Sequence, residues 1–275
     1  MDWSANGILP WAAYRAFMSG RLIVLDKYPG VRPVGVGETW QHLFAKIVFK
    51  VTGTEATMAC QDDQLCARLK AGIDGAIHKV RALWDEKSST KEWGFLLVDA
   101  KNTFNKINQV GMLLTVRHLR PSGYRFVFDC YCYWSLLVLR NSNETAGFLH
   151  IGESVLKGEH VKMIAYGIII LPLFKNTKQY IPDVTQPWYA DDAGALGTFA
   201  RLKKYFDSLT RQGLGRGYHP IPSKRVLIVR PENLQAGKLF RSRHGFKECT
   251  GARYLEGYIR DDKTKHNWLR ERKLT

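Results

Sequence analysis

The chain has 275 residues, of which 45% are hydrophobic, so it can bury a core, and wholesale disorder is excluded. Lys and Arg (41) outnumber Asp and Glu (25), which gives a formal net charge of +16. Such an excess repels itself unless an anionic partner offsets it, and nucleic acid is the commonest partner of that kind. The charge alone leaves two alternatives open, an anionic membrane surface and a merely basic protein without such a partner.

The cysteines and the apolar segments indicate where the protein acts. The five cysteines show no Cys-x-x-Cys pair and no zinc-finger spacing, and their odd number argues against a secreted disulfide framework. Met1–Trp11 lacks the pattern of a signal peptide, and the longest apolar run, Met163–Phe174, is shorter than the roughly 20 residues of a spanning helix. We therefore expect an intracellular protein, cytoplasmic or nuclear, that does not enter membranes. No feature of the sequence predicts its oligomeric state.

The first elements follow from composition and periodicity. Arg21–Glu38 is rich in Gly, Pro and Val and predicts strands joined by turns, whereas Trp40–Val51 is predicted to be helical or mixed. Asp62–Trp84 predicts an amphipathic helix that begins at Asp62 and Asp63, where acidic groups suit the helix dipole. Its apolar positions step by three or four: Leu65, Leu69, Ile73, Ile77, Val80 and Trp84.

In the middle of the chain, Phe95–Val98 predicts a buried strand that delivers Asp99 at its end. Asn102–Leu119 is predicted to be helical. The aromatic and β-branched content of Arg125–Leu139 predicts a strand, followed by a turn at 141–143. Glu153–Phe174 is predicted to pass from a loop into an apolar helix.

The last elements flank a pair of aspartates. Short apolar segments on both sides of Asp191 and Asp192 predict a hairpin. Phe199–Leu209 predicts a helix that the glycines after it break, and Arg225–Arg230 predicts a strand. The order strand, helix, hairpin, helix, strand from Asp99 onward suits an antiparallel sheet with helices on one face.

The acidic residues give the strongest chemical signal. Of the three Asp-Asp pairs, those at 62–63 and 261–262 are interpreted as a helix start and a surface turn. Asp191 and Asp192 instead lie between apolar segments, where two adjacent carboxylates are tolerable if a cation binds. With Asp99, they would offer oxygen ligands for two Mg²⁺ ions about 4 Å apart, which can activate a 3′-hydroxyl and stabilise pyrophosphate. The alternative is that these aspartates only cap a helix or form a turn.

Two motifs in these segments resemble those of a known family. Leu97–Asn105 (LVDAKNTFN) resembles the first catalytic motif of reverse transcriptases, and Gln186–Asp192 (QPWYADD) resembles their Tyr-x-Asp-Asp box. The order and separation also match, and the resemblance, which is closest to retrotransposon enzymes, extends from about Arg21 to about Ile259. It implies an RNA-directed DNA polymerase of a retrotransposon that adds deoxynucleoside triphosphates to a primer on an RNA or DNA template. Its cofactor would be two Mg²⁺ ions, with Mn²⁺ as a substitute.

The resemblance also assigns roles to residues. Asp99, Asp191 and Asp192 would be catalytic and hold the metals. Phe104 would match the aromatic gate that leaves no room for a 2′-hydroxyl, although a core phenylalanine is the plainer interpretation. Lys224 would protonate the leaving pyrophosphate, against the alternative of an ordinary surface lysine.

Two basic segments would bind the nucleotide. Lys27 and Arg32, in the segment KYPGVRPV, resemble the fingers segment that grips the triphosphate, for which a solvated basic turn is the alternative. Lys157 and Gly158 fall in the nucleotide-binding loop, where the family usually has Gln-Gly-Asp-Pro and this chain has KGEH. In Tyr254–Gly257, which resembles the primer-grip hairpin, a glutamate stands where glycine is typical.

These departures leave the metal ligands intact but change nucleotide positioning, which can be worth several powers of ten in rate. The alternative is therefore a catalytically decayed, reverse-transcriptase-like remnant that binds nucleic acid. A two-metal nuclease that shares only the carboxylates is a third hypothesis, against which Phe104 and the fingers segment count.

The expected fold class is α+β, with the fingers and palm of a right-hand polymerase and a thumb that is short or absent. The antiparallel palm sheet would carry helices on one face. Residues 1–90 would form a fingers-like region, residues 91–260 the palm with the catalytic carboxylates, and residues 261–275 a basic tail or truncated connection.

Overall fold

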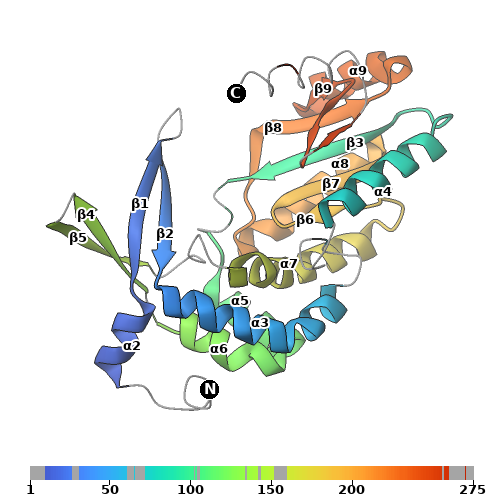
Figure 1. Cartoon of the computed structure of the whole chain (residues 1–275). Coiled ribbons are helices and arrows are strands. Elements are labelled where there is room, and N and C mark those ends of the chain that lie inside the picture. Colours follow the sequence, from blue (N-terminus) through green and yellow to red (C-terminus); the bar gives the residue numbers. More distant parts are fainter. Residues whose placement is uncertain are drawn as a thin grey trace. The chain divides into compact units, whose positions relative to one another are not determined.

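The structure, a computed structural model, forms two compact units that interleave along the chain (Figure 1). One unit contains Met1–Cys60 and Asn102–Ile170, and the other contains Gln61–Lys101 and Leu171–Thr275. The predicted boundary at residue 90, between a fingers-like region and a palm, is a division by function and stays a prediction. The structure describes residues 10–26, 31–60, 65, 72–101, 103, 106–133, 135–141, 144–151, 160–255, 257–259 and 270.

The first unit contains a four-stranded sheet in the order β2-β1-β4-β5. β1 and β4 run parallel, and the other neighbours are antiparallel. The strands predicted between Arg21 and Glu38 are confirmed as β1 and β2. The four strands are β1 (Gly20–Asp26), β2 (Val31–Gly37), β4 (Ser135–Asn141) and β5 (Glu144–Ile151).

Helices of the first unit agree with the sequence in part. The helix predicted from Trp40 is confirmed as part of α3, and α5 begins where the Asn108 side chain accepts a hydrogen bond from the Gly111 amide. An apolar helix is also confirmed as α7, which continues into the second unit. The helices are α2 (Trp11–Met18), α3 (Thr39–Cys60), α5 (Gln109–Leu119), α6 (Pro121–Tyr131) and α7 (His160–Tyr180).

The strand predicted for Arg125–Leu139 is wrong in its first half, which belongs to α6. Pro121 occupies the start of this helix, where its fixed backbone angle favours helix and its missing amide costs nothing. The aromatic and β-branched residues that suggested a strand instead form the buried face of α6, so tertiary packing overrides β-propensity here. These buried residues include Phe126, Val127, Cys130 and Tyr131.

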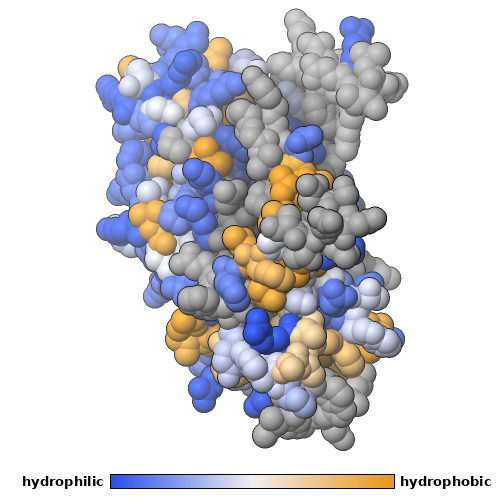
Figure 2. Space-filling view, turned by 90° about the vertical axis from the view of Figure 1, so that its left-hand side faces the viewer, coloured by the Kyte–Doolittle hydropathy of each residue, from blue (hydrophilic) through white to orange (hydrophobic). Residues whose placement is uncertain are grey.

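Large apolar side chains remain exposed on the sheet of the first unit. Figure 2 looks onto the side of the molecule that carries β4 and β5, and hydrophobic atoms gather there among hydrophilic ones. Contiguous apolar surface of this kind is typical of a binding face. The exposed apolar residues of this sheet include Ile23, Val24 and Leu25 on β1 and Phe148 and Leu149 on β5. Within the described part of the chain, no helix is both long and apolar enough to cross a bilayer.

The second unit is built around a five-stranded sheet in the order β6-β7-β3-β8-β9. Its strands pair antiparallel except for β8 and β9, which run parallel. The buried strand before Asp99, the hairpin around Asp191 and the strand from Arg225 are confirmed. The strands are β3 (Trp93–Ala100), β6 (Trp188–Tyr189), β7 (Asp192–Thr198), β8 (Pro220–Val229) and β9 (Lys247–Cys249).

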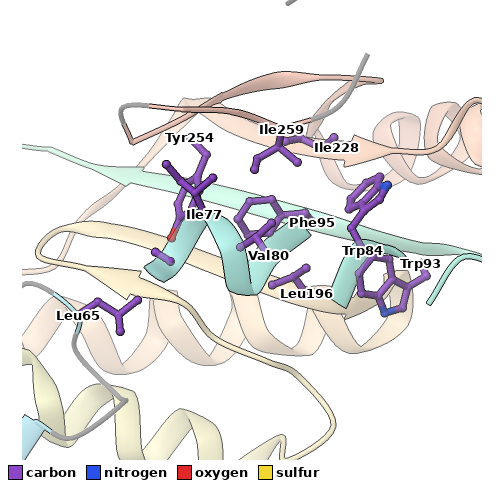
Figure 3. Packing of buried hydrophobic residues seen from close by; sticks show 11 residues of the cluster. Leu65, Ile77, Val80, Trp84, Trp93, Phe95, Leu196, Ile228, Tyr254 and Ile259 are labelled. Carbon is purple, nitrogen blue, oxygen red and sulfur yellow. The ribbon is translucent and has the colours of Figure 1, made fainter. Parts of the chain in front are cut away.

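Helices cover both faces of this sheet, so the expectation of helices on one face is wrong. On one face, α4 (Gly72–Glu86) and the hairpin of β10 (Ala252–Tyr254) and β11 (Gly257–Ile259) pack against Phe95 (Figure 3). On the other face, a Cβ added at Gly94 would lie 3.2 Å from the ring of Phe199, the first residue of α8 (Phe199–Gly213). Helices lie on both faces because successive residues of β3 are apolar, and their side chains, which point to opposite faces, must both be buried.

Glycines permit this close packing, and Gly194 of β7 gives a direct test. A Cβ at Gly194 would lie 2.8 Å from the Phe95 ring and 2.8 Å from the Pro187 carbonyl oxygen. We expect Gly194→Ala to destabilise the protein by about 1–3 kcal/mol in urea denaturation, because the strands must move apart. Gly75→Ala, in the exposed part of α4 with nothing within 4 Å, should instead stabilise it by about 0.5–1 kcal/mol. Equal effects of the two substitutions would contradict the packing described here.

Candidate active site

The acidic residues predicted from the sequence lie together in the second unit. The register of β3 and β7 ends with the pair of Val98 and Ala193, and Asp99 and Asp192 are the residues next to this pair on the two strands. The negative charges of Asp99 and Asp191 both act on the Asp192 carboxyl, so the three side chains lie near one another. Asp191 precedes Asp192 in the turn, so the fold gathers all three carboxylates at one end of this ladder.

A strained two-residue turn sets the position of Asp191 and Asp192. Tyr189 pairs with Asp192, which leaves only Ala190 and Asp191 to reverse the chain. Ala190 has a φ of 51° and is buried. A left-handed backbone costs a residue with a Cβ about 1–2 kcal/mol, and such strain concentrates at functional sites. The tight turn therefore fixes the carboxylates at the expense of local stability.

The buried side chain of Tyr218 ties this turn to β3. Its hydroxyl lies 3.2 Å from the carbonyl oxygen of Val98 and 3.2 Å from that of Asp191. The single hydroxyl proton is donated to these two acceptors, which belong to the residue before Asp99 and to Asp191 itself. Tyr218 thus links the backbone of both carboxylate-bearing segments. Sequence reasoning missed it, because no local motif marks a residue whose partners lie 120 and 27 positions away.

Lys224 reaches Asp99 from an irregularity in β8. The β3–β8 ladder pairs Val98 with Arg225 and Ala100 with Pro220, so residues 221–224 of β8 lie opposite Asp99 alone. The Lys224 Nζ donates to Asp99 Oδ2 at 2.5 Å. Bulges of this kind re-aim side chains and are common beside active sites. Since both side chains are partly exposed, at 52% and 34%, the pair contributes at most about 1 kcal/mol.

The carboxylates repel one another, and Asp192 shows the effect. Burial, followed by the negative charges of Asp191 and Asp99, raises its pKa to about 6, although Arg253 and Lys224 oppose the rise. The Asp192 side chain as a whole stays exposed, so water screens part of the repulsion. The site is therefore an accessible concentration of negative charge with two cations beside it.

The hairpin of β10 and β11, which matches the prediction at Tyr254–Gly257, brings Arg253 to this site. The buried Tyr254 hydroxyl donates to the Pro187 carbonyl at 3.1 Å, and its ring packs edge-on against Phe95 with centroids 5.0 Å apart. Arg253 Nε donates to the Leu255 carbonyl at 2.9 Å. Sequence reasoning found the hairpin but missed Arg253 as a basic neighbour of Asp192.

The three aspartates suit a divalent cation in chemistry, since Mg²⁺ prefers carboxylate oxygens and would relieve their repulsion. In the described residues, however, no three His, Cys, Asp or Glu side chains are grouped closely enough to hold a metal ion. Asp99 is turned toward Lys224, whose ammonium supplies the compensating charge. The predicted metal roles of Asp99, Asp191 and Asp192 stay predictions.

The predicted nucleotide-binding residues are described only in part. Arg32 lies in β2 of the first unit, where it pairs with Leu25 of β1, and nothing further is described for its side chain. The remaining predicted contacts, Lys27, Phe104, Lys157 and Gly158, lie outside the described residues, as do Asp62, Asp63, Glu256 and the segment 261–269.

Neither a model of a known protein family nor a curated protein matches the sequence. Solved structures do match. Apo telomerase from Candida tropicalis has a TM-score of 0.63 and 12% identity over 82% of this chain and 46% of its own. Telomerase from Candida albicans in complex with a TWJ fragment of telomeric RNA has a TM-score of 0.62 and 10% identity over 81% and 45%. This chain thus spans about half the length of the telomerases it resembles. The likeness shows that it has a reverse-transcriptase-like α+β fold.

The raised pKa of Asp192 predicts how stability depends on pH. A carboxyl whose pKa rises from 3.8 to about 6 on folding stabilises the fold when protonated, and this contribution is lost as the pH rises through 6. Asp192→Asn should therefore raise the Tm at about pH 8 and lose most of this advantage at about pH 4. Asp207→Asn, which removes the partner of Lys203 on the surface of the same unit, should give no such gain. A pH-independent difference would contradict the repulsion.

Tyr218→Phe tests the link between β3 and the turn. Removing the hydroxyl leaves two carbonyl oxygens without this donor and should cost about 1 kcal/mol in urea denaturation. Tyr180→Phe, at a residue that is 63% exposed, is the control and should change stability by less than about 0.5 kcal/mol. If the two variants are equally stable, Tyr218 does not hold the turn.

Proposed function

We propose that this chain is the polymerase core of an RNA-directed DNA polymerase, which extends a primer 3′-hydroxyl with deoxynucleotides on an RNA or DNA template. The observation that carries the proposal is the convergence of Asp99, Asp191 and Asp192 at one end of the β3–β7 ladder in a reverse-transcriptase-like fold. The chain as a whole carries a net charge of +16, which suits a polyanionic substrate. The local cluster of negative charge suits the cations that such a substrate also binds.

The reaction is a nucleotidyl transfer. The primer 3′-hydroxyl loses its proton to water, its oxygen forms a bond to the α-phosphorus of the deoxynucleoside triphosphate, the bond from that phosphorus to the bridging oxygen breaks, and pyrophosphate leaves. Asp99, Asp191 and Asp192 would hold two Mg²⁺ ions, or Mn²⁺ in their place, which supply activation of the hydroxyl and neutralisation of the leaving group.

The cations of the site act on phosphate. Lys224, which already contacts Asp99, would donate a proton to the leaving pyrophosphate, a contribution of about 10²–10⁴-fold for a positioned acid. Arg253, beside Asp192, can contact backbone phosphate of the primer. Lys27, Arg32, Phe104, Lys157 and Gly158 retain the nucleotide-binding roles that the motif resemblance assigns.

RNA is the first template to test. One of the similar telomerases was solved with a fragment of telomeric RNA, and the motifs of this chain resemble those of retrotransposon enzymes. A retrotransposon origin rests on that motif resemblance alone, and it predicts a protein that acts in the cytoplasm or nucleus.

A second candidate is a catalytically decayed remnant that binds nucleic acid. Two observations favour it: Asp99 is compensated by Lys224 instead of sharing a preformed metal cage, and the nucleotide loop reads KGEH at 157–160. Such a protein would fold and bind a template without turnover.

Incorporation of labelled deoxythymidine triphosphate on poly-rA/oligo-dT, with Mg²⁺ and then Mn²⁺, decides between these functions. We expect incorporation that falls to background in Asp191→Asn, because the variant loses a carboxylate from the proposed metal site. Asp183→Asn, a surface aspartate of the same unit that pairs with Arg201, should keep the wild-type rate.

A folded wild-type protein that incorporates nothing overturns the polymerase proposal for this copy. The triple variant Lys157→Gln, Glu159→Asp and His160→Pro then tests its cause, because restored incorporation would locate the defect in the loop. Binding without incorporation in both proteins supports the remnant, and cleavage without triphosphates supports a nuclease.

A further inference from the structure

The first unit carries a cavity of about 590 Å³ that the polymerase proposal does not use. It lies among α2, the end of α6 and the β4–β5 hairpin, and its volume is in the range of ligand pockets, about 300–1,000 Å³. Its lining includes Trp11, Tyr14, Arg15, Tyr133 and His150.

Three aromatic rings in this lining form one platform. Trp11 and Tyr14 are stacked, with centroids 5.6 Å apart and an interplanar angle of 15°. Tyr133 meets both edge-on, at 5.0 Å from Trp11 and 5.5 Å from Tyr14. Rings at these distances are in mutual contact, so a ligand can stack only on their outer faces. Such faces remain open, since Trp11 is 56% and Tyr133 is 54% exposed.

The platform is anchored before any ligand binds. The Tyr14 hydroxyl donates to the Asp129 carbonyl at 2.6 Å and lies 3.7 Å from the Cys132 sulfur. Burial raises the pKa of Tyr14 further above its usual range, so this hydroxyl stays a hydrogen-bond donor. A fixed aromatic surface loses little conformational entropy when a flat ligand stacks on it.

The charges around the platform select the ligand. Arg15 and His150 line the cavity and are exposed, and the carboxylate of nearby Asp129 is engaged by Arg125 at 3.0 Å. An aromatic cage for a quaternary ammonium group would be opposed by the Arg15 cation, whereas Arg15 and an imidazole N–H of His150 can donate to the phosphate of a flat ring system. These observations point to a nucleotide of an unpaired strand, since bases in a duplex are already stacked.

We propose that Trp11, Tyr14 and Tyr133 stack an unpaired base of single-stranded nucleic acid, while Arg15 and His150 contact the adjoining phosphates. The choice of nucleic acid rests on the proposed function, but the site lies in the other unit and needs no catalysis. It would hold a template or primer strand independently of the carboxylates.

Binding of labelled oligo-U and oligo-dT of about 12 nucleotides, followed by fluorescence anisotropy, tests the site and distinguishes RNA from DNA. Trp11→Ala with Tyr133→Ala should weaken binding by about ten-fold or more, the scale of lost base stacking. Trp11→Phe, which keeps a ring, should bind nearly as the wild type. Trp40→Ala, at a tryptophan of the same unit that is 65% exposed, is the matched control and should not change affinity.

Salt dependence and cross-linking keep the test independent of folding. Arg15→Gln should reduce the slope of log affinity against log salt by about one. Oligo-bromouridine cross-linked to the wild-type protein should modify the peptides that contain Trp11 or Tyr133. Equal affinity of the double variant and Trp40→Ala, or cross-links confined to other peptides, overturns the proposal.

The outcome is separable from that of the polymerase proposal. Asp183→Asn should bind the oligonucleotides like the wild type, because this aspartate belongs to the second unit and lies outside the proposed catalytic residues. If incorporation is absent but affinity depends on Trp11 and Tyr133, the polymerase proposal fails and the stacking site stands. If incorporation occurs and the double variant binds normally, the stacking site fails alone.

Discussion

The organisation of the second unit depends on holding like charges close together at one end of a β-ladder. The pairing of β3 with β7 brings Asp99 and Asp192 to the same end of the ladder, and their repulsion, together with that of Asp191, opposes this arrangement. Three features hold the arrangement against this repulsion: the backbone ladder, the tight turn at Ala190 and the Tyr218 hydroxyl, which donates to backbone carbonyls on both segments. Lys224 and Arg253 offset only part of the charge, so the carboxylates remain available to a further cation.

Holding the carboxylates together requires a rigid sheet, and the sheet is rigid because its strands are buried on both faces. Phe95 and its neighbours pack under α4 and the β10–β11 hairpin, while α8 covers the opposite face at Gly94. Gly257 lets the hairpin approach α4 so closely that a Cβ would lie 2.7 Å from Ile77. A sheet clamped in this way cannot relax its register to separate the charges, because a one-residue slip would move every buried side chain to the other face.

Local patterns in the sequence were sufficient where the structure depends on neighbours in the chain. The apolar run before Asp99 and the segments around Asp191 predicted a strand and a hairpin correctly. Arg125–Tyr131 was mistaken for strand because its aromatic residues have high β-propensity, whereas Pro121 and burial against other helices decide for α6. Tyr218, Arg253 and the Trp11 platform could not be found, because their significance arises from contacts with residues outside their own local motifs, such as Tyr14 with Asp129. The nucleotide-binding residues outside the described part of the chain depend on the motif resemblance.

The energetics of the carboxylates bear on whether this fold still serves catalysis. A protein that only needs to fold gains nothing from three acidic side chains in mutual repulsion or from an alanine with a positive φ, and both cost stability. The exposed Lys224–Asp99 pair is weak enough, at no more than about 1 kcal/mol, that a divalent cation could displace the ammonium. Strain and repulsion gathered at one point are the features that function, not stability, requires. These costs support the proposed metal-dependent site over a remnant, whereas the departure from the family's motif at residues 157–160 concerns the proposed positioning of the nucleotide.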